Sequence, residues 1–130
     1  CAGFYCGITE TELAAALDSP VCPTITAALL CDGTFGRVTS SCAREVTAAN
    51  LLDTNEQLRP KIFACIAKAI PSASTWPPGC RACALDGVEC GSEKCSIQCA
   101  AGDGPGCDRC RVESGCNAAA YDCAQLPNPL

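Results

Sequence analysis

Cysteine constrains this chain more than any other residue, because fifteen of the 130 residues are cysteine. That share exceeds the roughly 8–10% that marks a disulfide scaffold in a short secreted protein. Large apolar residues are scarce, since Leu, Ile, Val and Phe together number only 24. A chain with so little apolar volume needs covalent cross-links to hold a fold. We therefore predict a disulfide-stabilised protein of an extracytoplasmic compartment, whether secreted, periplasmic, lumenal or on the outer surface.

The polar composition excludes several classes of function. No histidine is present, so Ser–His and Cys–His catalysis and histidine-containing zinc sites are excluded. The net charge of −5, with only nine basic residues, disfavours a nucleic-acid partner, which requires a clustered Lys/Arg face. The nearest carboxylate pairs lie at predicted helix starts or in turns, where they favour the helix dipole and solubility: Glu10/Glu12, Asp53/Glu56 and Asp86/Glu89. We expect a protein that is not an enzyme and has no cofactor.

Residues 1–70 hold 18 of the 24 large apolar residues and have helical periodicity. Thr9 and Glu12 have the spacing of a capping box, which closes the first turn of a helix, and Thr54 and Gln57 repeat it. Strand signals are nearly absent, because no apolar–polar alternation persists beyond a few residues. We predict an all-α fold with four short helices here, from Thr9 to Leu17, from Pro23 to the break at Asp32-Gly33, from Ser41 to about Leu52, and from Pro60 to Ile70.

Residues 80–130 hold nine cysteines but only six large apolar residues, so disulfides must replace a core there. These cysteines recur at helical spacings, which place the members of each pair on one face: Cys80/Cys83, Cys95/Cys99, Cys107/Cys110 and Cys116/Cys123. Residues 102–106 (GDGPG) predict a turn, and a last helix is expected from about Asn117 to Leu126. We predict hairpins of short helices and turns joined by facing cysteine pairs.

Residues 71–79, between these two parts, have the Pro- and Ser-rich composition of a linker. Trp76, the only tryptophan, has two interpretations there: a packing plug over a small core, or an exposed anchor for a partner. If Cys1 is set aside and all other cysteines pair, five lie before the linker and nine after it. Both numbers are odd, so at least one disulfide must join the two parts into one covalent unit.

Cys1 is the expected odd cysteine. A chain that opens Cys1-Ala2-Gly3 resembles a processed bacterial lipoprotein, in which the N-terminal cysteine is lipidated. Fourteen cysteines then remain, enough for seven disulfides. No apolar run approaches the roughly 18 residues of a membrane span, so we expect membrane contact only through a lipid on Cys1.

A four-thiolate metal site is the fallback hypothesis for two C-x-x-C pairs, Cys80/Cys83 and Cys107/Cys110. Two such pairs can supply a tetrahedral set of thiolates. However, five further cysteines lie between or after them, and an oxidising compartment converts such thiols into disulfides. We therefore expect no metal.

The function predicted from these features is that of a non-catalytic, exported structural or accessory protein, which packs on a larger protein assembly or a cell surface. Its expected partner is another protein or a second copy of itself. A covalently fixed surface binds at little ordering cost. The candidate contact residues are Phe4, Tyr5, Trp76, Tyr121 and Leu130 at the end of the Pro127–Leu130 tail. The alternative is a carrier of a small hydrophobic ligand such as a lipid, enclosed by helices of the first part: Leu13, Leu17, Leu29, Leu30, Phe63 and Ile66. An apolar cavity of several hundred Å³ would distinguish the carrier from the scaffold.

Overall fold

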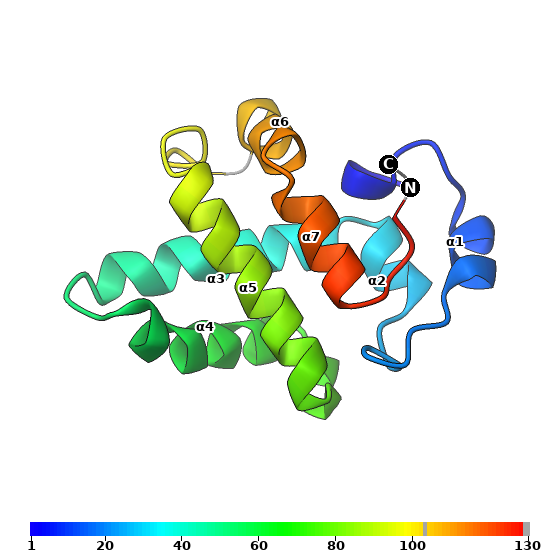
Figure 1. The fold of residues 1–130 in the computed structure, drawn as a ribbon, viewed down its shortest axis with the longest axis horizontal. Coiled ribbons are helices and arrows are strands. Elements are labelled where there is room, and N and C mark those ends of the chain that lie inside the picture. Colours follow the sequence, from blue (N-terminus) through cyan, green and yellow to red (C-terminus); the bar gives the residue numbers. More distant parts are fainter. Residues whose placement is uncertain (103, 129–130) are drawn as a thin grey trace.

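The computed structural model describes residues 1–102 and 104–128, and this part of the chain is helical with no strand (Figure 1). The prediction of a small all-α, disulfide-rich fold is confirmed. The elements in chain order are η1 (Gly3–Tyr5), α1 (Glu10–Ala16), α2 (Ala27–Cys31), α3 (Thr34–Ala49), α4 (Asn55–Ala69), η2 (Pro71–Thr75), α5 (Pro78–Lys94), α6 (Pro105–Glu113) and α7 (Cys116–Cys123).

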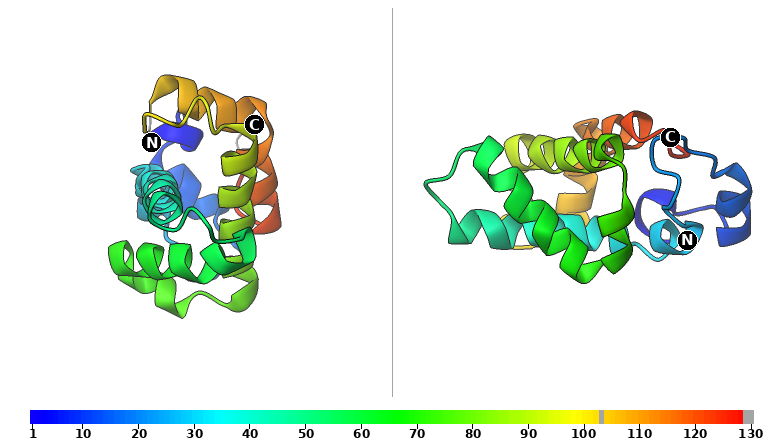
Figure 2. Two further views of the ribbon diagram at one scale, coloured as in Figure 1. Left: turned by 90° about the vertical axis from the view of Figure 1, so that its left-hand side faces the viewer. Right: turned by 90° about the horizontal axis from the view of Figure 1, so that it is seen from below.

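The helices form two packed groups, α3 with α4 and α5 with α6 and α7, and a small N-terminal lobe lies at one end. α3 and α4 are antiparallel neighbours, α5 crosses both of them, and α7 packs along α5 (Figures 1 and 2). α6 precedes α7 and lies near the end of α5. η1, α1 and α2 make up the lobe, which lies beside the C-terminal segment.

Side-chain caps set the helix starts in the first part. The Thr9 hydroxyl accepts a hydrogen bond from the Glu12 amide (3.1 Å), as the capping-box spacing predicts. The second box forms in both directions, with Thr54 N–H donating to Gln57 Oε1 (2.9 Å) and Gln57 N–H donating to Thr54 Oγ1 (3.2 Å). This box begins α4 at Asn55, so the predicted start at Pro60 is wrong, and Pro60 lies inside the helix.

Two other predicted helix starts are also wrong. α2 begins after Thr26, whose hydroxyl accepts from the Leu29 amide (3.3 Å), and not at Pro23. α3 begins at Thr34, about two turns before the predicted Ser41. The cause is the Asp32-Gly33 pair, which ends one helix and starts the next: Gly33 adopts a φ of 78°, and Asp32 Oδ1 accepts from the Thr34 amide (2.8 Å).

The segment predicted as a linker is instead packed structure. Residues 71–75 form η2, and α5 begins at Pro78. Trp76 is 1% exposed, with its ring centroid 5.8 Å from that of Phe35 and 6.2 Å from that of Phe63. The Arg81 guanidinium lies over the Phe63 ring, 4.8 Å from its centroid. Trp76 is therefore a packing plug, and the interpretation as an exposed anchor is wrong.

The predicted hairpins of cysteine-bearing segments are present. α5 and α7 are joined by two disulfides in antiparallel order, Cys83–Cys123 and Cys90–Cys116. The next hairpin repeats the pattern with Cys95–Cys110 and Cys99–Cys107. Cys95 and Cys99 lie in a series of turns and not on a regular helix, although Cys99 N–H still donates to Cys95 O (2.9 Å). The last helix ends at Cys123, before the predicted Leu126.

The described residues include all fifteen cysteines, which form seven disulfides. Only one of these disulfides joins the first part to the second, Cys22–Cys80.

Close packing supports the link between α5 and α7. Gly87 on α5 approaches Ala120 so closely that a Cβ at Gly87 would lie 2.9 Å from the Ala120 Cβ. Glycine at this position therefore lets the two helices reach the distance that the disulfides require.

Candidate ligand-binding site

A large cavity lies between α3, α5, α6, α7 and η1, with a volume of about 1070 Å³. This central cavity is at the upper end of the range of small-molecule sites. Its lining is mostly apolar and comes from both parts of the chain: η1, α2 and α3 from the first, and α5, α6 and α7 from the second. The cavity is partly enclosed and partly open to solvent.

Small side chains on two facing helices explain why this space is not filled. The wall on α5 presents Ala84, Gly87, Val88 and Gly91, which recur at i, i+3, i+4 and i+7 on one face. The wall on α3 presents Gly36, Ser40, Ala43 and Thr47 at helical spacing. Side chains this short do not reach across to the opposite helix. A Cβ at Gly36 or Gly91 would meet no atom within 4 Å.

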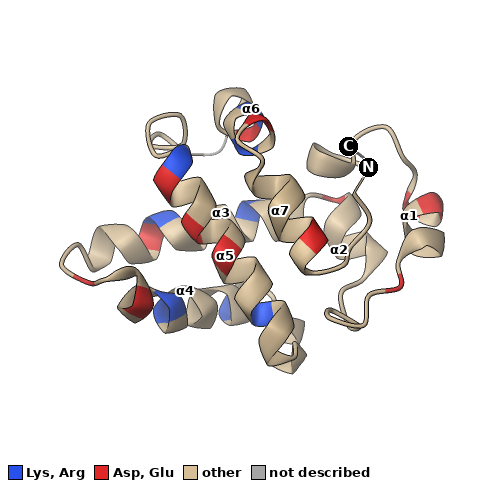
Figure 3. Ribbon diagram, in the orientation of Figure 1, with Lys and Arg blue, Asp and Glu red and all other residues tan. Residues whose placement is uncertain are grey.

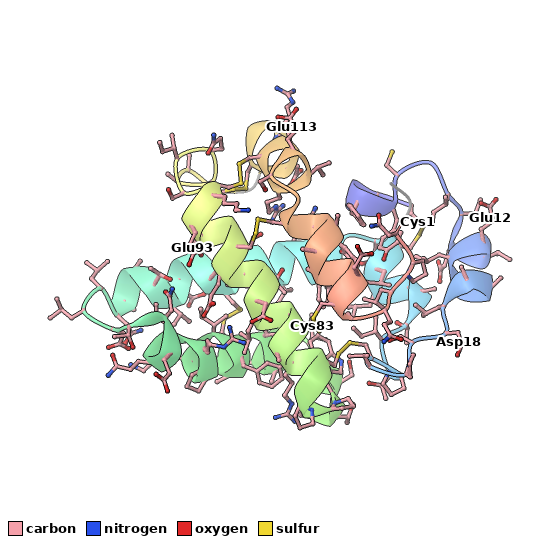
Figure 4. All side chains as sticks on the ribbon, viewed as in Figure 1. Cys1, Glu12, Asp18, Cys83, Glu93 and Glu113 are labelled. Atoms are coloured by element: carbon pink, nitrogen blue, oxygen red, sulfur yellow. A yellow bond between two sulfur atoms is a disulfide. The ribbon has the colours of Figure 1, made fainter. Side chains whose placement is uncertain are left out.

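Disulfides fix each wall of the cavity. Cys42–Cys65 holds α3 against α4, and Cys83–Cys123 and Cys90–Cys116 hold α5 against α7 (Figure 4). Cys95–Cys110 and Cys99–Cys107 hold α6 against the turns that follow α5. Covalent links between neighbouring elements stabilise walls that have little apolar packing across the cavity.

An aromatic cluster closes one end of the cavity. Phe4 and Tyr121 are stacked, with ring centroids 4.4 Å apart and planes 4° from parallel. Tyr5 meets both rings edge-on, at centroid distances of 5.4 and 5.3 Å. The Tyr5 hydroxyl donates to Pro127 O (2.7 Å), which ties the C-terminal segment to this cluster. Ile25, Leu30, Phe35 and Leu126 complete this aromatic end.

Burial controls the ionisation of the two tyrosines. Desolvation by burial raises the pKa of Tyr121 to about 12, and the nearby Arg111 opposes part of that rise. Burial raises the pKa of Tyr5 still further, with a smaller contribution from Tyr121. Both phenols are therefore neutral at physiological pH.

Four basic side chains line the cavity. Arg37 and Arg44 come from α3, and Arg109 and Arg111 come from α6. Arg111 donates to Asp108 on its own helix and to Ser40 on α3, so its guanidinium bridges the two walls. The acidic lining residues in the described part of the chain are Asp108 and Glu113. Figure 3 shows that α6 carries both signs of charge, whereas α1 carries only acidic residues.

The proposed contact residues do not form a surface. Tyr5 and Tyr121 are buried, at 1% and 8% exposed, and Phe4 is half-buried in the same cluster. These three residues and Trp76 lie in the interior and in the cavity wall, so a partner cannot contact them in this conformation. Leu130 lies outside the described residues. The large apolar side chains that are exposed are instead Leu51, Leu52 and Ile97. The sequence analysis did not identify them, because no periodicity separates them from core leucines.

The cavity is not where the carrier hypothesis placed it. Among the six residues proposed to enclose a ligand, only Leu30 lines the cavity. Leu13 and Ile66 are fully buried in the core, and Leu17, Leu29 and Phe63 pack against it. The prediction of a cavity between helices of the first part is therefore wrong, because those helices pack directly on each other. Sequence reasoning missed the facing small residues of α3 and α5, whose i, i+3, i+4 recurrence was the available signal.

The structure overturns the assignment of Cys1 as the odd cysteine. Cys1 Sγ is bonded to Cys31 Sγ, and the Cys1 amino group donates to Ile8 O (2.8 Å) (Figure 4). The sulfur is thus already used, and a thioether-linked lipid at Cys1 is incompatible with this pairing. Cys6 is the free cysteine, and it is exposed. None of the described helices has the length and apolar content of a membrane-spanning segment.

The fallback metal site is also incompatible with the structure. Cys80, Cys83, Cys107 and Cys110 are bonded to four different cysteines, so none is a thiolate ligand. In the described part of the chain, no group of three or more His, Cys, Asp or Glu residues has the arrangement of a metal site.

Ion pairs account for three of the six carboxylates considered above. Asp86 and Glu89 share Arg59, with N···O distances of 3.0 Å each. Asp53 pairs with Lys61 on α4. Glu10 and Glu12 lie in the first turn of α1 on the outside of the lobe (Figure 4). These carboxylates lie outside the cavity lining.

Comparison with known proteins gives no relative: no protein-family model, curated protein or solved structure matches this chain. The site must therefore be interpreted from its own chemistry.

Proposed function

We propose that this protein is an extracytoplasmic binding protein for a small molecule with an apolar chain, held in the central cavity. The observation that carries this proposal is a cavity of about 1070 Å³ with mostly apolar walls. A close-packed interior would have favoured the structural protein predicted from the sequence, whereas a cavity of this size favours the carrier. The many disulfides support an oxidising compartment for the protein.

The energetics of such a site favour a flexible apolar chain. Each methylene group removed from water contributes about 0.8 kcal/mol, so a chain of several carbons gives measurable affinity without specific hydrogen bonds. The walls are held by disulfides before the ligand arrives, which lowers the cost of ordering on binding.

Filling the cavity from one wall is the direct test. Gly91 lies on α5 within the lining, and a side chain there enters open space. Decanol at ten times its dissociation constant is expected to stabilise the wild-type chain by about 1.4 kcal/mol, measured as a rise in Tm. Gly91→Leu is expected to raise the Tm without ligand, because it fills space and removes a helical glycine, and to weaken decanol binding in calorimetry.

Gly106→Leu is the matched control. Gly106 is also a helical glycine with no atom within 4 Å of a Cβ, but it lies on α6 outside the lining. This variant is expected to bind decanol as the wild type does. Equal binding by both leucine variants would place the ligand elsewhere, and no binding by the wild type would reject the carrier function.

The second candidate is the accessory protein predicted from the sequence. Leu51 and Leu52, in the loop between α3 and α4, are 80% and 99% exposed, and Ile97 is 86% exposed. The α3–α4 loop and the turns after α5 lie at the same end of the molecule (Figure 1). Exposed apolar side chains of this kind favour a protein partner. The decanol titration separates the two candidates, because a scaffold has no need of a ligand in its interior.

A further inference from the structure

We propose that the protein docks on a lipid surface of no net charge through Leu51, Leu52 and Ile97, which places an opening of the central cavity against the lipid. The inference deepens the proposed function by naming the partner, and it rests on that function for the role of the cavity. Four properties support it: the opening of the cavity, the position of the exposed apolar side chains, the lack of charge around them, and their area.

The cavity lining changes from buried to exposed along two of its helical walls. On α3, Ala43 is buried, whereas Thr47 and Ala48, about one turn further on, are exposed. On α5, Val88 is buried, whereas Ser92 is exposed. Both helices end on the same side of the molecule (Figure 1). The cavity is therefore open to solvent between the end of α3 and the turns after α5.

Large exposed apolar side chains lie beside this opening. Leu51 itself lines the cavity and is 80% exposed, and its neighbour Leu52 is 99% exposed. Ile97 is 86% exposed and follows Ser96, which is another lining residue. In the described part of the chain, these three are the only large apolar side chains that are exposed. Leu51, Leu52 and Ile97 thus form an apolar rim on the two segments that border the opening.

The segments that carry the apolar rim have almost no charge. Residues 46–54 and 95–102 include one charged residue, Asp53, although 18% of the chain is charged. The Asp53 carboxylate pairs with Lys61 on α4. Anionic membranes attract clusters of basic residues, and these two segments contain no basic residue. The apolar rim therefore fits a lipid surface of no net charge better than an anionic one.

The area of the apolar rim fits a lipid surface better than the protein partner of the second candidate. Three side chains of this kind bury on the order of 300 Å² of apolar surface, whereas each partner of a stable protein complex buries about 800 Å². Their carbon atoms number about twelve, close to those of a myristoyl chain, which binds bilayers reversibly with an association constant of about 10⁴ M⁻¹. A reversible contact of this strength suits a carrier, which must also leave the lipid.

Vesicles of phosphatidylcholine, a lipid with no net charge, test the inference by co-sedimentation. The wild-type chain is expected to be half bound at roughly 0.1 mM accessible lipid. Leu52→Asp and Ile97→Asp are each expected to lower the association constant about tenfold or more, because each removes an apolar side chain and adds a charge. Neither residue lines the cavity, so both variants are expected to bind decanol as the wild type does, which shows that they are folded.

Thr11→Asp is the matched control, because it adds the same charge at an exposed position of α1, at the other end of the molecule (Figure 1). This variant is expected to bind vesicles as the wild type does. Equal loss of vesicle binding in all three variants would indicate a general charge effect and contradict docking through the apolar rim.

The vesicle and decanol measurements together separate this inference from the proposed function. Decanol binding by a wild-type chain that does not bind vesicles would overturn the inference and leave the proposed function intact. Vesicle binding that depends on Leu52, without decanol binding, would support the docking surface and reject the proposed function. Absence of both would reject both.

Discussion

Removal of the Cys22–Cys80 disulfide is expected to destabilise the protein by about 4 kcal/mol. This bond closes a loop with a sequence separation of 58 residues, and the chain-entropy model assigns about 4 kcal/mol to a loop of that length. It is also the one disulfide between the two parts of the chain. The change is made as Cys22→Ala with Cys80→Ala, because both side chains are buried and a serine pair would bury two hydroxyls.

Cys99→Ala with Cys107→Ala is the matched control. That disulfide spans only 8 residues, for which the same model gives about 2.5 kcal/mol. Guanidinium unfolding followed by circular dichroism gives both values. The first double variant is expected to lose more stability than the second. The reverse order would show that packing between the two parts, and not the covalent link, holds them together.

Alkaline pH is expected to destabilise the protein steeply through Tyr5 and Tyr121. In the unfolded chain both phenols ionise near pH 10, whereas burial raises the pKa of Tyr121 to about 12 and raises that of Tyr5 as well. The unfolded state therefore binds fewer protons above pH 10, and stability falls as pH rises. The expected slope is about 1.4 kcal/mol per pH unit for each tyrosine between pH 10 and 12. Below pH 10 the contribution is constant.

Urea unfolding at several pH values up to 11, read by circular dichroism, measures this slope. Tyr121→Phe is expected to halve the slope between pH 10 and 11, while a Cys6→Ser background prevents the free thiol from attacking the disulfides. The two chains differ only at residue 121, so the difference between their slopes isolates this phenol. An identical slope in wild type and variant would show that Tyr121 ionises in the folded state as easily as in the unfolded state.

The fold class followed from the sequence because two of its signals are local and chemically strong. The spacing of Thr9 and Glu12 and that of Thr54 and Gln57 marked helix starts, and both caps form. The cysteine spacings predicted the stapled hairpins of the second part. With one cysteine of the first part unpaired, five remain there and nine in the second part, and these odd numbers required a link, which is Cys22–Cys80. The unpaired cysteine is Cys6 and not Cys1.

The helix boundaries and the site were harder to predict for a physical reason. Pro60 resembles a helix start, but the cap at Thr54, more than one turn earlier, starts the helix instead. The cavity depends on which faces of α3 and α5 oppose each other, and no disulfide joins these two helices, so their facing is a matter of long-range packing. The disulfides that fix their neighbours have a connectivity that a single sequence does not specify. Phe4, Tyr5 and Tyr121 were selected as aromatic residues for contact with a partner. They contact each other instead, because burying three rings stabilises the end of a cavity that has little other apolar packing.

The central claim is that disulfides fix an all-helical frame around the central cavity, and a disulfide map tests it most directly. Proteolysis without reduction, followed by mass spectrometry, is expected to yield seven linked peptide pairs: Cys1–Cys31, Cys22–Cys80, Cys42–Cys65, Cys83–Cys123, Cys90–Cys116, Cys95–Cys110 and Cys99–Cys107. Cys6 is expected to be the only thiol that reacts with iodoacetamide before reduction. A paired Cys6 with a lipid on Cys1, or cysteines of α5 linked elsewhere than to α7, would contradict the frame and the cavity that depends on it.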